Sequence, residues 1–104
     1  MDQAISKNGV PIRLSNERWL HITTGHPETA GLYFEILETI ENPLCIYQGN
    51  YDELIAIGRI GNIQDKFIVV VYKEIKLSDG FVITAYISNK MQSFKKKKII
   101  WKQR

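Results

Sequence analysis

Two histidines, His21 and His26, are the side chains of this 104-residue sequence best suited to proton transfer. They are its only histidines and stand five positions apart, on either side of Gly25. The ordinary pKa of histidine lets it accept and donate protons near neutral pH. In one cleft, the pair would be sufficient for RNA transesterification: one takes the 2′-hydroxyl proton and the other protonates the leaving 5′-oxygen. The alternative is a surface histidine on a helix followed by a helix-capping histidine.

A metal or cofactor is not expected. The histidine spacing differs from the HExxH metal motif, and the single cysteine, Cys45, is distant in sequence. One cysteine also excludes an internal disulfide and favours a reducing, cytoplasmic location. No apolar run approaches the ~18 residues of a membrane span. We therefore expect no membrane association and no signal peptide.

A second group of polar residues falls on predicted strands. Arg59 ends one strand between two glycines, where a guanidinium can hold a phosphate bidentately. Strand alternation places Thr84, Tyr86 and Ser88 on one face of another strand. That face is either a polar platform for a ligand or an exposed sheet surface, and Arg59 is either a phosphate ligand or a solvated edge charge.

Charge is divided unevenly along the chain. Residues 90–104 carry seven cations and no acid, whereas residues 1–89 carry seven cations and eleven acids, a net charge of −4. Lysine clusters bind nucleic acids through phosphate contacts, and aromatic residues among them can stack on bases. The alternative is a solvated terminus or a lysine-protected edge strand. The candidate RNA-binding residues are Lys90, Lys95, Lys96, Lys97, Lys98, Trp101 and Lys102, with Phe94 as a further aromatic.

The elements that must position these residues follow from periodicity and turn signals. A helix over 16–24 is capped by Ser15, and a second over 27–41 has apolar residues at helical spacing. A short strand around 11–14 is possible, and the later chain is typical of β structure. The expected strands are 44–48, 53–60, 66–74, 81–89 and, at the edge, 99–102. We predict a single α+β domain over 1–104, with two N-terminal helices packed on a four- to five-stranded antiparallel sheet.

The order of parts resembles the barnase–EndoU–colicin–RelE (BECR) group of small nucleases over about residues 11–102. It looks most like the phage-associated and toxin–antitoxin branches, including BrnT-type toxins. The motifs that carry the resemblance are Trp19-Leu20-His21-Ile22, His26-Pro27-Glu28, Ile40-Glu41-Asn42-Pro43, Ile57-Gly58-Arg59, Phe67-Ile68-Val69-Val70-Val71-Tyr72 and Val82-Ile83-Thr84-Ala85-Tyr86.

The resemblance implies a BECR/RelE-like fold and a metal-independent endoribonuclease, usually a toxin held inactive by a small antitoxin. The catalytic residues would be His21, His26, Arg59, Thr84 and Tyr86. The expected partners are RNA and a small acidic antitoxin, with homo- or hetero-oligomers possible. The alternative is a non-catalytic module that binds nucleic acid or docks an antitoxin through residues 90–104.

Overall fold

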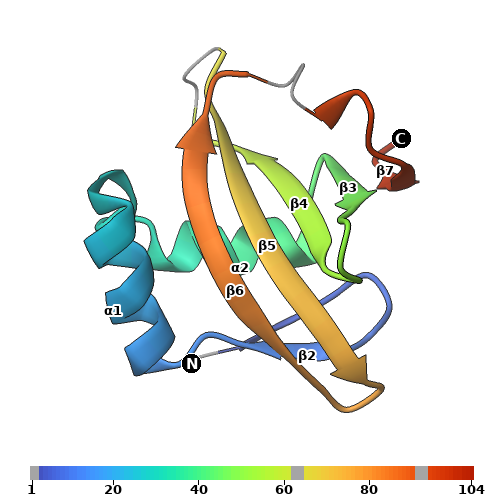
Figure 1. The fold of residues 1–104 in the computed structure, drawn as a ribbon, viewed down its shortest axis with the longest axis horizontal. Helices are drawn as coiled ribbons and strands as arrows, with labels where there is room; N and C mark the ends of the chain where they lie inside the picture. Colours follow the sequence, from blue (N-terminus) through green and yellow to red (C-terminus); the bar gives the residue numbers. More distant parts are fainter. Residues whose placement is uncertain (1–2, 62–64, 91–93) are drawn as a thin grey trace.

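The computed structural model describes residues 3–61, 65–90 and 94–104. Within them, seven strands form one curled sheet in the order β1-β2-β6-β5-β4-β3-β7 (Figure 1). The elements in chain order are β1 (Gln3–Ile5), β2 (Pro11–Arg13), α1 (Asn16–Gly25), the 3₁₀ helix η1 (Pro27–Thr29), α2 (Tyr33–Glu41), β3 (Cys45–Gln48), β4 (Leu54–Arg59), β5 (Phe67–Lys76), β6 (Asp79–Ser88) and β7 (Ile99–Lys102).

The expected fold of two N-terminal helices on a four- to five-stranded antiparallel sheet is wrong. The part of the chain that the structure describes is mostly sheet, a curled half-barrel of seven strands that holds 42% of the described residues. The N-terminal hairpin of β1 and β2 joins the sheet because β2 pairs in parallel with β6, through Ile12↔Gly80 and Arg13↔Phe81. Such a pairing between distant parts of the chain leaves no local pattern in the sequence, and β1 is only three residues long.

The predicted helix over 27–41 is divided in the structure. Its first residues form η1, where the Thr29 hydroxyl donates to the His26 carbonyl at 2.7 Å and closes a tight turn. The α-helix α2 begins only at Tyr33, after Gly31, since glycine is a poor helix former. By contrast, α1 begins as expected, with the Ser15 hydroxyl accepting from the Arg18 N–H at 3.1 Å.

The sheet has two faces that are covered differently. The helix-side face packs against α2 and contributes Ala56, Val70 and Ala85 to the main core. Residues directly opposite on paired strands share a face, so Ile57, Val69 and Tyr86 lie together on the other side, the outer face. There a smaller cluster is closed by Phe94, which is only 4% exposed.

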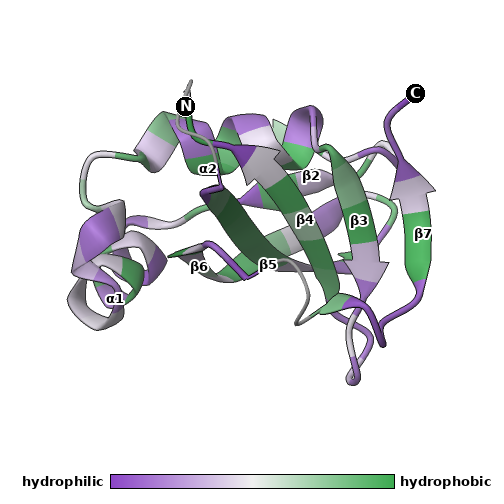
Figure 2. Cartoon of the chain, turned by 90° about the horizontal axis from the view of Figure 1, so that it is seen from above, coloured by the Kyte–Doolittle hydropathy of each residue, from purple (hydrophilic) through white to green (hydrophobic). Residues whose placement is uncertain are grey.

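At Gly58, α2 approaches the sheet closely. A Cβ built on Gly58 would lie 2.6 Å from the Thr39 hydroxyl oxygen, closer than real contacts allow. Glycine therefore lets helix and strand touch directly beside Arg59. The helix α1 lies at one side of the molecule next to β6, and β7 lies at the opposite side (Figure 1; Figure 2). None of the helices in the described ranges has the length and apolar character to cross a bilayer.

Candidate functional site

Polar and charged side chains gather where β4 and β6 end and β5 begins. The register pairs Arg59 with Phe67 and Phe67 with Ser88, so these three residues form one row across the sheet. At about 4.8 Å between neighbouring strands, the backbones of Arg59 and Ser88 lie roughly 10 Å apart. This end of the sheet therefore carries an exposed guanidinium and a hydroxyl on the outer face.

His26 reaches this region because it stands between α1 and η1. It ends α1, where its N–H donates to the Ile22 carbonyl at 2.7 Å, and its φ of −133° and ψ of 76° turn the chain out of the helix. Both α1 and η1 contact β6. The imidazole consequently lies with its ring centroid 5.5 Å from that of Tyr86.

Glu28 is the charged partner of His26. Its Oε2 lies 3.6 Å from the imidazole Nδ1, with both side chains about two-fifths exposed. This separation is longer than a hydrogen bond, so the carboxylate acts on the imidazole through its charge. It faces Nδ1, and Nε2 is the ring nitrogen that Glu28 does not engage. The pair resembles a general base with an orienting acid, set beside a tyrosine.

A cleft of about 490 Å³ lies at the end of β6, next to this pair. Lys66 and Lys90 bring two ammonium groups to it and Glu28 one carboxylate, so its lining is net positive. The Ser88 hydroxyl, also in the lining, accepts from the Lys90 N–H at 3.0 Å. Ammonium and hydroxyl groups are suitable ligands for a phosphate. The complete lining is Glu28, Lys66, Ile87, Ser88, Asn89 and Lys90.

Tyr86 and Thr84 lie on the outer face of β6, as strand alternation predicts. Their cross-strand partners are Val69 and Val71, which stand two residues apart on β5. Burial raises the pKa of the Tyr86 phenol. Tyr86 therefore keeps its proton near neutral pH and can act as a donor.

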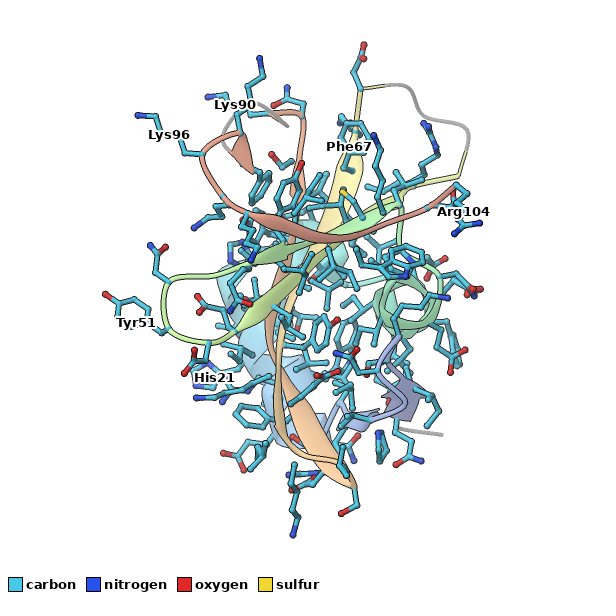
Figure 3. All side chains as sticks on the ribbon, turned by 90° about the vertical axis from the view of Figure 1, so that its right-hand side faces the viewer. His21, Tyr51, Phe67, Lys90, Lys96 and Arg104 are labelled. Atoms are coloured by element: carbon cyan, nitrogen blue, oxygen red, sulfur yellow. The ribbon has the colours of Figure 1, made fainter. Side chains whose placement is uncertain are left out.

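His21 lies elsewhere. Its side chain is exposed on α1, in a separate hollow of about 250 Å³ with Glu17, Leu20 and Thr24. Five helical residues rotate a side chain by about 140°, so His21 and His26 leave the helix in different directions. Figure 3 shows His21 well apart from Lys90 and Lys96. The structure does not bring the two histidines into one cleft.

The basic segment forms a different surface. Lys95, Lys96 and Lys98 are exposed. Its aromatic rings face the protein: Phe94 stacks on Tyr47 at 5.5 Å, and Trp101 packs against the main core. The Trp101 ring also has the Lys7 ammonium 5.1 Å from its centroid, so a base that stacked on this side of the ring would displace Lys7. Within the segment, residues 91–93 lie outside the described ranges.

Two parts of this site were not singled out from the sequence. Glu28 appeared only within a motif, and Lys66 not at all. Lys66 directly precedes β5, whose first residue pairs with the end of β6 through Phe67↔Ser88. Without that register, the sequence does not place Lys66 near Ser88. Among the described residues, no group of three or more His, Cys, Asp or Glu side chains could hold a metal ion.

Comparison with known proteins leaves the site to be interpreted from its own chemistry. No protein-family model, curated protein or solved structure matches this chain.

Proposed function

We propose that the chain is an endoribonuclease with His26 as its general base. The supporting observation is the His26 imidazole, held between the Glu28 carboxylate and the Tyr86 ring beside a cleft that contains Lys66 and Lys90. An acid–base pair next to a net positive cleft suits a substrate whose reacting group is a phosphodiester.

In the proposed reaction, the neutral Nε2 of His26 takes the proton of a ribose 2′-hydroxyl. The 2′-oxygen then forms a bond to phosphorus while the bond from phosphorus to the 5′-oxygen breaks. Tyr86 protonates the departing 5′-oxygen, which leaves a 2′,3′-cyclic phosphate and a 5′-hydroxyl. Proton exchange with water afterwards restores neutral His26 and protonated Tyr86.

Glu28 and the lysines have supporting roles in this proposal. The Glu28 carboxylate orients the imidazole and stabilises the imidazolium that forms during the reaction. Lys66 and Lys90 offset the charge that develops on the phosphoryl oxygens, and Arg59 binds the neighbouring phosphate from the next strand but one. His21 has no part in it, so this proposal replaces two histidines with one histidine and one tyrosine.

Single-histidine variants test the proposal. Purified wild-type protein and the variants His26→Ala and His21→Ala are incubated with total RNA in EDTA, and the fragment ends are analysed. His26→Ala should lower the cleavage rate by about 10²–10⁴-fold, the usual contribution of a general base. His21→Ala removes the same group from α1, the helix that precedes His26, and should leave the rate within about twofold of wild type.

Three outcomes would contradict the proposal. Equal losses of cleavage rate in the two variants would favour the two-histidine mechanism. A cleavage rate in His26→Ala equal to that of the wild type would exclude His26 as the general base. RNA binding without cleavage by the wild type would favour a non-catalytic nucleic-acid-binding module.

The toxin role and the acidic antitoxin implied by the resemblance stay predictions. Toxicity on induced expression would test the first, and co-purification would test the second.

A further inference from the structure

The two outermost strands of the sheet differ in how their free edges are protected. The β1 edge lies against α2, and the Ile5 N–H there donates to the Glu41 carboxylate at 3.1 Å. At the other end of the sheet, β7 pairs on one side with β3, and the described residues place no strand on its other side. The outer edge of such a strand presents backbone N–H and C=O groups with which another extended chain can pair.

Apolar side chains accompany the β7 edge. Ile99 and Ile100 are 44% and 41% exposed, although both belong to a strand. The register passes from Tyr47↔Ile99 to Ile46↔Trp101, so Ile100 is the extra residue of a bulge and has no partner residue on β3. Backbone groups and apolar surface are therefore available together over a few residues.

Charge decides which chain suits this edge. Lys95, Lys96 and Lys98 precede β7, Lys102 ends it, and all four are exposed. Pairing of β7 with β7 of a second copy would place these lysines close to one another, which is unfavourable. RNA would satisfy the lysines, but it would leave the isoleucines and the backbone edge unused.

We propose that the β7 edge binds an extended acidic segment of another protein, which adds to the sheet as an eighth strand. Backbone hydrogen bonds would hold the segment, the isoleucines would receive its apolar side chains, and the lysines would select for Asp and Glu. The proposal is independent of the ribonuclease activity, because β7 and His26 lie on different parts of the sheet.

Amide hydrogen exchange of the full chain tests this proposal. The probe is a short capped peptide of alternating valine and glutamate, and its control has lysine at every glutamate position. At a peptide concentration about ten times its Kd, exchange of the β7 amides should slow about tenfold. The protection should weaken as salt increases. The lysine peptide should leave β7 unchanged.

Matched variants locate the effect. Ile100→Asp at the edge should abolish the protection, whereas Leu77→Asp, at an 87% exposed apolar position in the β5–β6 turn, should keep it. Lys98→Gln provides a milder second variant and should weaken binding severalfold. Circular dichroism verifies that each variant is folded.

The proposal is overturned if the acidic peptide fails to bind or binds without protecting β7. Equal protection by the lysine peptide would overturn the charge argument. Equal protection by a short single-stranded RNA would assign the surface to nucleic acid. Concentration-dependent self-association that protects β7 would assign the edge to a second copy.

Discussion

The two faces of the sheet are covered by different parts of the chain. The helix-side face is covered by α2, and the main core between them includes Ile36 and Ile40 of the helix and Tyr72 of β5. The outer face has a smaller apolar cluster, in which Ile57 and Val69 are also fully buried, with the half-buried Tyr86 at its margin beside His26. We therefore expect stability to depend mainly on the first face, and the proposed catalytic residues His26 and Tyr86 lie on the side of the second. The predictions below test that division.

The largest stability effect should come from Ile40→Ala on α2. Ile40 is fully buried, and its truncation leaves a cavity that costs about 3 kcal/mol of unfolding free energy. Urea denaturation measures the loss, and the cleavage rate per folded molecule should not change. The control is Phe34→Ala on the same helix, where the side chain is 73% exposed and the expected change is within about 0.5 kcal/mol. Equal effects at the two positions would show that α2 does not seal the core.

Tyr86→Phe should show the reverse pattern. It removes one hydroxyl from the outer face, so cleavage should fall about 100-fold while the unfolding free energy stays within about 0.5 kcal/mol. Single-turnover cleavage and urea denaturation of the same preparation give both values. A normal cleavage rate would exclude Tyr86 as the acid. A large loss of stability would mean that the outer face is structural.

Phe94→Leu tests how thinly the outer face is covered. The substitution loses the stack on Tyr47 but keeps most of the apolar volume, so we expect a loss of about 1 kcal/mol by urea denaturation. Amides near Phe94 should also exchange faster, while those of α2 stay unchanged. A loss as large as that of Ile40→Ala would make the two faces equal in stability.

The smallest effect at neutral pH concerns Tyr72. Burial raises the pKa of its phenol far above the ordinary value. The folded state then keeps a proton that the unfolded chain releases above pH about 10, so stability is full below that pH and falls as the pH rises further. Tyr72→Phe should flatten this fall above pH about 10 in urea titrations. An unchanged slope would assign the alkaline loss to other groups.

Local patterns predicted much of the molecule. The expected strands from 44 onward agree with β3 to β7 within a few residues. The face shared by Thr84, Tyr86 and Ser88 was predicted as well, because alternation is a property of the strand itself. Nothing in the sequence indicated the bulge at Ile83. Tyr72 pairs with Val82 and Val71 with Thr84, and this shift of register changes which apolar residues of β6 enter the core.

The long-range features could not be predicted. The position of the helix end decides whether the two histidines lie close together. His26 is one residue beyond the end of α1 and lies beside Tyr86 of β6, whereas His21 lies on α1. The pairing of β2 with β6 involves only two residue pairs. Their energetic value comes from the packing of Ile12 and Leu14, both fully buried, rather than from strand propensity.

The parallel pair of β2 and β6 has a consequence for synthesis. Ile12 and Gly80 are 68 positions apart, whereas the strands from β3 to β6 follow one another closely in the sequence. Because closing the longer loop costs more entropy, we expect the meander to form first and the N-terminal hairpin to dock last. On a ribosome that adds about 5–20 residues per second, Ile12 waits about 3–14 s for its partner strand to be made. β2 is therefore made well before β6, the strand that completes its pairing in the sheet.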